Sequence, residues 1–426
     1  MIYSPNELFK LWGTVALNSF GGPAAQISVI HKLVVEDKKI ITEKKFLNAL
    51  NFCMLLPGPE AQQLATYMGW IMNGWRGGII AGGLFILPGF ISILLLSYIY
   101  ILFNDVKLIQ GIFYGIKPAI TVIVILALVR IGKKSLNNKF LFFIAFAAFI
   151  ALFFFNISFP IVILIAGLLG IIHGQLFNIH IKETKLISRP LLKNSIKTLS
   201  LGITLWFLPI FCVAIFWGAD SNLHRLNIFF SKMSLTTFGG AYAALSYVSQ
   251  QAVDVFGWLK NGEMLDGLAL AESTPGPLIQ VVQYVGFMGG YRFSDGMSPM
   301  FSAFLASVLT TWMTFAPCFI FIFTFAPYVE YIQSKKVFFD ALNSITAAVV
   351  GVIFNLSLWF FINTIFQNFV HINSCFLNFN YPTFDSVDYY GLVILIISSF
   401  MQVKLKISLL PTLGVAIILG LLKFFI

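Results

Sequence analysis

The stretch Gly78–Phe103 has the sequence GIIAGGLFILPGFISILLLSYIYILF and contains no charged residue. A helix needs about 20 residues to cross a hydrocarbon core of about 30 Å, so this stretch is long enough to span a membrane. Strands of a membrane barrel would alternate in polarity over about ten residues, and this stretch does not alternate. Comparable apolar runs follow at Gly111–Val129, Phe140–Asn156, Ile161–Phe177, Phe301–Tyr328, Val337–Phe361 and Ile407–Phe425. The sequence therefore predicts an all-α polytopic membrane protein.

The overall composition supports the same fold class. Hydrophobic residues make up 58% of the 426 positions, charged residues make up 10%, and the mean hydropathy is +0.89. A soluble domain carries roughly a quarter charged residues. The net charge of +10 comes from basic residues in short loops between apolar runs, which is typical of multi-pass proteins of the bacterial inner membrane. We therefore expect a multi-pass protein of the bacterial inner membrane, with membrane lipids as neighbours and no nucleic-acid partner.

Motifs for a metal, a nucleotide or a catalytic triad are missing from the sequence. The four cysteines and five histidines are scattered without paired spacing. The sequence has no G-x-x-x-x-G-K-[ST] loop for ATP. The N-terminal residues do not follow the pattern of a cleaved signal. We therefore expect a protein that is not an enzyme and that holds no metal or cofactor.

An internal repeat divides the chain. The segment Leu17–Gly22 (LNSFGG) reappears as Leu235–Gly240 (LTTFGG), and Pro57-Gly-Pro59 reappears as Pro275-Gly-Pro277. Both pairs are offset by the same 218 residues. We therefore predict two homologous halves, each with two broken or re-entrant helical segments and about four transmembrane helices. The expected division is residues 1–180 for the first repeat, 181–220 for a basic linker and one extra connecting helix, and 221–426 for the second repeat.

The distribution of lysine and arginine orients the two halves. Lys32–Lys45 holds five lysines and Arg130–Lys139 holds four basic residues. Both stretches lie in the cytoplasm only if the first Pro-Gly-Pro segment enters the membrane and returns on the same side. The corresponding stretch of the second half, Gln251–Glu263, holds one lysine, so its Pro-Gly-Pro segment is expected on the outer side. This pattern predicts inverted repeats, as in many secondary transporters.

The broken segments are the candidate substrate site. Proline and glycine interrupt helices, and each interruption exposes a helix N-terminus whose free N–H groups suit an anion. Amide and hydroxyl groups that follow the breaks add hydrogen-bonding capacity and would still release a bound oxyanion. The alternative is that these polar groups only hold helices together. The candidate substrate-binding residues are Gly21, Gly22, Gly58, Gln62, Gln63, Thr66, Gly239, Gly240, Gly276, Gln280 and Tyr284.

Two carboxylates lie at the edges of the breaks, in segments that are otherwise nearly uncharged. Glu60 and Glu272 are candidates for coupling or gating, because an ionisable residue at membrane depth is expensive to keep there. The alternative for Glu60 is that it caps a first helical turn. Lys117 is expected either to attract an anion or to extend its charge to the interface. Arg76 and Arg292 are expected to mark the membrane edge or to funnel anions inward.

These motifs resemble those of the chromate transporter family in its long-chain, two-domain form, and the resemblance spans nearly the whole chain. The residues that match the family motif are Phe20, Gly21, Gly22, Pro23, Pro57, Gly58, Pro59, Glu60, Gln62, Gln63, Thr66, Tyr67, Phe238, Gly239, Gly240, Pro275, Gly276 and Pro277. The resemblance implies an inner-membrane carrier that exports chromate and recognises sulfate as a second tetrahedral dianion. The halves differ at Leu278, where the first half has Glu60, and at Ala241, where it has Pro23.

The leading hypothesis is therefore a secondary transporter of a small tetrahedral oxyanion that works by alternating access around broken helices. The alternative from another substrate class is a flippase for a lipid phosphate such as a polyprenyl phosphate. A channel and a membrane-embedded enzyme are the remaining alternatives. The expected partners are the oxyanion and membrane lipids, and a homodimer is left open.

Overall fold

The computed structural model describes residues 3–103, 105–176, 192–238, 240–329, 336–374 and 377–425. Within these residues the chain is almost entirely helical, and its one sheet is an antiparallel hairpin of β1 (Phe369–Ser374) and β2 (Leu377–Pro382), with Phe369 opposite Pro382. The described helices that are long and apolar enough to cross a membrane are Glu60–Phe103, Lys107–Ser135, Phe159–Leu176, Ser195–Trp217, Pro299–Tyr328 and Phe339–Ile365. The predicted all-α polytopic membrane fold is confirmed.

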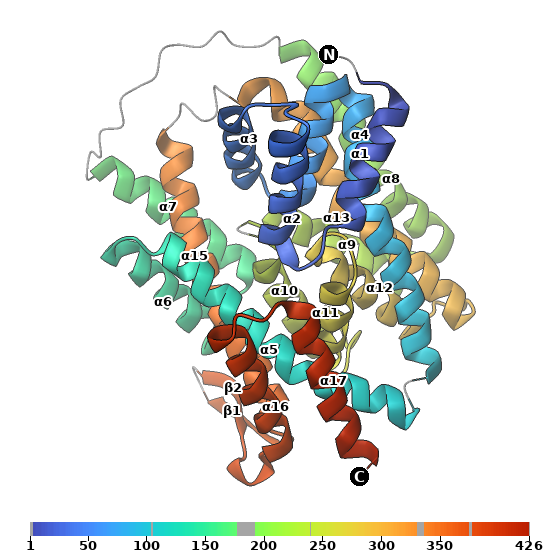
Figure 1. Ribbon diagram of the computed structural model, residues 1–426, viewed down its shortest axis with the longest axis vertical. Coiled ribbons are helices and arrows are strands. Elements are labelled where there is room, and N and C mark those ends of the chain that lie inside the picture. The colour runs from blue at the N-terminus through green and yellow to red at the C-terminus, as the bar shows by residue number, and fades with distance from the viewer. Residues whose placement is uncertain are drawn as a thin grey trace.

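The first part of the chain contains both predicted helix breaks (Figure 1). Its first helix begins with a capping box in which Ser4 and Glu7 bond each other's backbone N–H groups. The chain leaves the helical conformation at Phe20-Gly-Gly22 and again at Pro57-Gly-Pro59. The elements are α1 (Pro5–Leu17), α2 (Gly22–His31), the π-helical η1 (Lys32–Asp37), α3 (Glu43–Leu55), α4 (Glu60–Phe103), α5 (Lys107–Ser135), α6 (Lys139–Phe153) and α7 (Phe159–Leu176).

The second part of the chain repeats this order. After the connecting helix α8, a helix ends at a Phe-Gly-Gly break, the next helix ends in a π-helical turn, and a further helix ends at a Pro-Gly-Pro break. The elements are α8 (Leu192–Trp217), α9 (Asn222–Thr236), α10 (Ala241–Gln250), η2 (Gln251–Val255), α11 (Glu263–Ser273), η3 (Leu278–Gln280), α12 (Val281–Arg292), α13 (Pro299–Phe325), η4 (Ala326–Tyr328), α15 (Lys336–Ile365), η5 (Phe384–Ser386), α16 (Tyr389–Ser399), η6 (Phe400–Lys404) and α17 (Leu409–Phe425).

Each Pro-Gly-Pro segment is the tip of a helical hairpin. In the first half Phe52 of α3 and Tyr67 of α4 flank the break, and their rings pack with centroids 5.4 Å apart. In the second half Glu263 of α11 pairs with Arg292 at the far end of α12, at 2.6 Å. Figure 1 shows α3 and the start of α4 above α11 and α12 in this view. The chain therefore folds back at both motifs, while the depth and orientation of the hairpins in a membrane stay predictions.

The long helix α4 contains a reversal that the sequence analysis did not foresee. Asn73 and Gly74 leave the helical region, with φ of −151° and 57°. The helical segments before and after this turn run in opposite directions and pack against each other. Gly69 lies against the Gly77 backbone, and Thr66 lies beside Gly82. Side chains larger than hydrogen would not fit at these contacts. The membrane-length part of α4 therefore begins just after this turn, near the start of the predicted run Gly78–Phe103.

The helices form two groups. Helices α5, α6 and α7 of the first half pack against α15, α16 and α17 of the second half, whereas α1–α4 and α8–α13 comprise the two hairpins and the helices packed around them. Figure 1 shows the first group on the left and lower part of the view and the second group above and to the right. One cluster of buried apolar side chains lies mainly among α1–α4, and a larger cluster extends across the boundary between the two groups, from α5–α7 to α8–α13 and α15–α17. The boundary between the two groups places the site described below.

Close packing of α5 against α17 gives a direct test of this arrangement. A Cβ on Gly420 would press on the Gly111 carbonyl oxygen, while a Cβ on Gly414 of the same helix would meet no atom within 4 Å. Gly420→Ala should therefore lower the melting temperature of the detergent-solubilised protein, because an overpacked contact costs about 1–3 kcal/mol. Gly414→Ala, the matched control, should leave it unchanged or raise it slightly. Equal melting temperatures for the two variants would contradict this helix contact.

Candidate functional site

The two Pro-Gly-Pro tips are held by reciprocal hydrogen bonds between the halves. The Gly58 N–H donates to the Thr237 carbonyl oxygen at 2.6 Å, and the Gly276 N–H donates to the Ser19 carbonyl oxygen at 2.9 Å. The acceptors are the residues just before Phe238 and Phe20, so each tip is bonded to the other half's Phe-Gly-Gly break. An exchange of equivalent bonds in both directions is typical of a contact with two-fold symmetry.

Both tip glycines have backbone conformations that other residues rarely adopt. The φ angles are +129° at Gly58 and +121° at Gly276. The second tip is held further by Gln26 of α2, whose Nε2 donates to the Gly276 carbonyl oxygen at 2.6 Å. A buried backbone group without a partner would be costly in a membrane. The N–H groups of both tip glycines are therefore satisfied by carbonyl oxygens of the other half.

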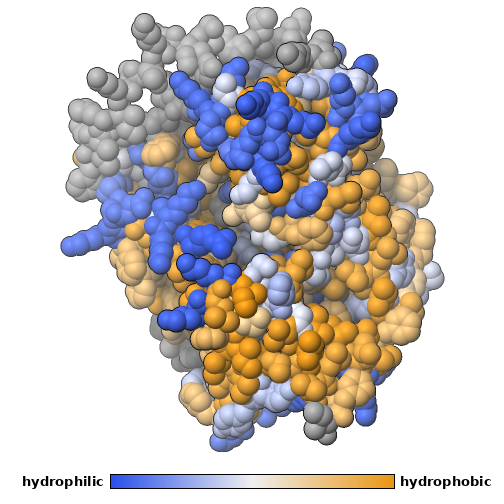
Figure 2. All heavy atoms as spheres, viewed as in Figure 1, coloured by the Kyte–Doolittle hydropathy of each residue, from blue (hydrophilic) through white to orange (hydrophobic). Residues whose placement is uncertain are grey.

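A cavity of about 1130 Å³ lies between the hairpin helices and the α5–α15–α17 group. From the hairpin side it is lined by the starts of α2 and α10, at Gly22 and Ala241, and by the two carboxylates Glu60 and Glu272. Gly21, Gly22 and Gly240 all have positive φ angles, which allow the sharp entry into each helix. Figure 2 shows hydrophilic side chains over the upper part of this face and around a hollow to the left of its centre.

Positive charge at this cavity comes from residues that the sequence analysis left unassigned. Arg130 and Lys134, near the end of α5, and Lys406, before α17, all line it. Arg130 and Lys134 are four residues apart and so share one face of α5. None of the three side chains has a hydrogen bond or ion pair with a residue in the described ranges. Arg130 and Lys134 lie in a stretch that the sequence places in the cytoplasm, but the position of all three cations on the cavity wall depends on tertiary packing.

The two carboxylates have different surroundings. Glu272 is 2% exposed and accepts a hydrogen bond from the Tyr242 hydroxyl at 2.7 Å. Glu60 is half-buried, begins α4, and forms no hydrogen bond or ion pair with the described part of the chain. Both therefore lie where the coupling hypothesis requires, facing the same cavity from non-equivalent positions in the repeat. Their coupling or gating role stays a prediction.

The predicted polar side chains lie outside the cavity wall. Gln62 donates to Thr66 at 3.0 Å, and Gln63 donates to the Pro57 carbonyl oxygen at 2.7 Å. In the second half Gln280 donates to Gln283 at 2.6 Å. These side chains are fully buried.

Tyr284 is also fully buried, and its ring packs against Tyr100. The bonds of the three glutamines and Thr66 agree with the alternative of holding the structure together. The anion-binding role of all five residues stays a prediction. Gly58 and Gly276 act at the tips, and Gly239 lies outside the described residues.

The remaining charged residues named from sequence have partners away from the cavity. Lys117 pairs with Asp266 of α11 at 3.2 Å, and Tyr100 donates to the same carboxylate at 3.0 Å. Arg292 pairs with Glu263, whereas Arg76 stacks over the Trp75 ring at 5.4 Å. Asp266 and Glu263 thus occupy the end of α11 opposite to Glu272. The Lys117–Asp266 pair links the two halves at a point that sequence spacing could not reveal.

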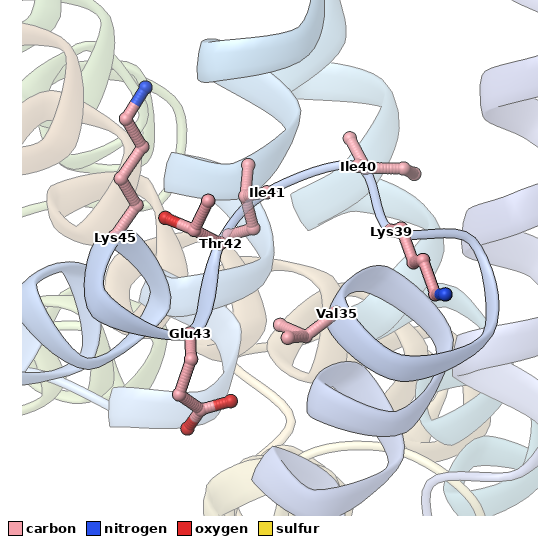
Figure 3. Close-up of a pocket in the computed structure, with 7 residues that line it drawn as sticks. All are labelled: Val35, Lys39, Ile40, Ile41, Thr42, Glu43 and Lys45. Carbon is pink, nitrogen blue, oxygen red and sulfur yellow. The ribbon is translucent and has the colours of Figure 1, made fainter.

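A smaller hollow of about 380 Å³ lies between η1 and α3 (Figure 3). Lys45 and Glu43 at its edge point in opposite directions in this view. Glu43 also pairs with His31 at 2.6 Å. No group of charged side chains converges on this hollow, so the larger cavity is the better candidate.

A multi-pass helical protein whose broken helices meet at a cavity with charged residues in its wall has the architecture of a membrane transport protein. The sequence matches the family described as "Chromate transporter" over residues 6–171 and 224–422. It is 32% identical to a "Chromate transport protein" of Pseudomonas aeruginosa, covering 82% of this chain and 79% of that one. It is 25% identical to a "Probable chromate transport protein" of Synechococcus elongatus, covering 82% and 83%. The chain belongs to the chromate transporter family.

A shorter relative covers only part of the chain. The "Uncharacterized transporter YwrB" of Bacillus subtilis is 30% identical over 162 residues, which are 37% of this chain and 81% of that one. No solved structure matches the chain.

The Lys117–Asp266 pair predicts a measurable coupling between the halves. Lys117→Met alone leaves a buried carboxylate unpaired, which costs up to about 3–5 kcal/mol when the site is fully dry. The loss should lie toward the lower end, because the Lys117 side chain is 30% exposed. The double variant Lys117→Met with Asp266→Asn should recover much of the lost melting temperature. Strictly additive losses in the two single variants would show that the pair contributes nothing.

Proposed function

We propose that this protein is a secondary carrier that exports a small tetrahedral oxyanion across the bacterial inner membrane, with chromate as the first candidate and sulfate as the second. The observation that carries the proposal is that two helix starts, one from each repeat, open into one cavity. The relatives named for chromate transport support chromate as the first candidate.

The chemistry of the cavity suits a doubly charged anion. The starts of α2 and α10 offer free N–H groups and the positive ends of two helix dipoles. Arg130, Lys134 and Lys406 add positive charge at the cavity wall. Chromate and sulfate carry only acceptor oxygens, so backbone donors and cations complement them. The cations are exposed, which keeps the attraction weak enough for release.

The proposed alternating access uses the two groups of helices. Arg130 and Lys134 belong to a stretch expected in the cytoplasm, which supports a carrier that is open to the inside in this state. On the other side of the Pro-Gly-Pro tips, the Lys117–Asp266 and Arg292–Glu263 pairs hold α11 against α5 and α12. In the proposed cycle the hairpin helices move against α5–α7 and α15–α17, the cavity closes, and the Lys117–Asp266 pair, which joins the two groups, separates.

The proposed cycle uses an inverted relation of the two halves. The reciprocal bonds at Gly58 and Gly276 are what a two-fold axis between the halves would produce. The charge difference between Lys32–Lys45 and Gln251–Glu263 supports placing that axis in the membrane plane. A repeat of this kind lets the same hairpin motion open either side. Glu60 and Glu272, which face the cavity, are the proposed coupling groups.

Transport by the purified full chain in proteoliposomes tests the proposal. We expect saturable uptake of chromate, inhibition by sulfate, and a response to an imposed pH gradient. Flux that rises linearly with concentration would favour a channel. Movement of a polyprenyl phosphate without any chromate flux would favour the flippase and overturn the proposal.

Charge-removing variants test the cavity wall within the same assay. Arg130→Gln with Lys134→Gln should lower chromate uptake several-fold at low salt, because these cations attract the anion before it binds. The difference should shrink as ionic strength rises, since the Debye length falls to about 8 Å at 0.15 M salt. Lys133→Gln, on the same helix but outside the cavity lining, is the control. The wall plays no part in attracting the anion if the cavity variant behaves like Lys133→Gln at every salt concentration.

A further inference from the structure

One hydroxyl at the cavity stands between a carboxylate and a helix start. Tyr242 is the second residue of α10, is 8% exposed, and donates its hydroxyl hydrogen to Glu272. The same oxygen lies 3.9 Å from the position that a Cβ on Gly22, the first residue of α2, would take. The hydroxyl therefore lies beside the start of α2, on a side chain that belongs to the first turn of α10.

A phenol hydroxyl has a single hydrogen to donate. While Glu272 is ionised, that hydrogen is held by its carboxylate at 2.7 Å. When Glu272 takes up a proton from water, the carboxyl no longer needs a donor, and the hydroxyl is free to turn toward an oxyanion at the start of α2. Protonation also removes a negative charge from the cavity wall. Both effects favour anion binding after proton binding.

We propose that the Tyr242 hydroxyl is the switch that couples the proton on Glu272 to the oxyanion. The inference rests on the proposed function and deepens it, because it names the group through which proton and anion affect each other. One proton would leave with each doubly charged anion, so a net charge of −1 moves outward and the inside-negative membrane potential drives export. Tyr242 acts through its hydrogen bond, and Glu272 is the group that gains and loses the proton. The switch predicts that oxyanion affinity falls as pH rises, and that binding of the anion draws a proton onto Glu272.

The charged groups around Glu272 are consistent with this assignment. Tyr242 is its only hydrogen-bond partner among the described residues, and Arg130 of α5 interacts electrostatically with that tyrosine. The other charged residues that line the cavity are Glu60, Lys134 and Lys406.

The other two carboxylates of α11 form ion pairs: Asp266 with Lys117, and Glu263 with Arg292. No cation is therefore paired with Glu272 within the described ranges. Its charge state depends on the proton and on this hydroxyl.

A double-mutant cycle on the full chain separates the switch from simple charge repulsion. Chromate binding is measured above neutral pH, where chromate keeps both charges. Glu272→Gln imitates the protonated carboxyl and should tighten chromate binding about tenfold or more, since a hydrogen bond to a charged group is worth that much. In a Tyr242→Phe background the same substitution should change affinity far less. Tyr247→Phe, on the same helix outside the cavity lining, should behave as the unsubstituted protein.

Each outcome decides one question. If the unsubstituted protein binds neither chromate nor sulfate, the proposed function fails. If it binds chromate but Glu272→Gln tightens binding equally in both backgrounds, only charge repulsion acts and the switch is overturned. If Tyr242→Phe does not fold, proton uptake on chromate binding decides instead. The unsubstituted protein should take up a proton and Glu272→Gln should not, and equal uptake by the two would refute the assignment.

Discussion

The structure depends on satisfying the backbone where its helices break. A chain interrupted by Pro-Gly-Pro loses helical hydrogen bonds at a depth where water is scarce, so the exposed groups need partners within the protein. Here each tip glycine donates to a carbonyl oxygen of the opposite half, and Gln26 adds a bond to the second tip. The acceptors belong to the Phe-Gly-Gly breaks. Neither tip glycine has its N–H acceptor within its own half. The two halves must therefore meet at these breaks.

The cavity is a consequence of that meeting. With the tips bonded to the opposite Phe-Gly-Gly segments, the helices that follow those segments begin side by side, and their starts at Gly22 and Ala241 line one space. The group formed by α5, α15 and α17 covers the space and contributes the cations. The backbone N–H donors come from the helix breaks that recur in both halves. The positive charge comes from α5 and from Lys406, before α17. An anion at this boundary would be sensitive to any movement between the two groups.

Much of the fold was predictable because the signals are local and strong. The length of the apolar runs specified helices across a membrane, and the 218-residue offset specified where each helix breaks. The candidate site was predictable only in part. Gly21, Gly22, Gly240, Glu60 and Glu272 do line one cavity, as helix breaks and isolated carboxylates suggested.

The other site residues depend on contacts that one sequence does not reveal. The glutamines Gln62 and Gln280 follow the breaks in sequence but are buried in helix contacts away from the cavity, where Gln62 bonds Thr66 and Gln280 bonds Gln283 and Thr311. The cavity cations and the Lys117–Asp266 pair arise from helices far apart in the chain. Tyr242 gave no signal at all, since a tyrosine one residue after a helix start is ordinary until Glu272 is seen beside it.

The most direct test is to locate the anion itself. Crystals of the full chain grown with chromate would show chromium by its anomalous scattering. A single chromium peak between the starts of α2 and α10, within reach of the Gly22 and Ala241 N–H groups, is the predicted result. A peak elsewhere in the molecule, with this cavity empty, would contradict the account.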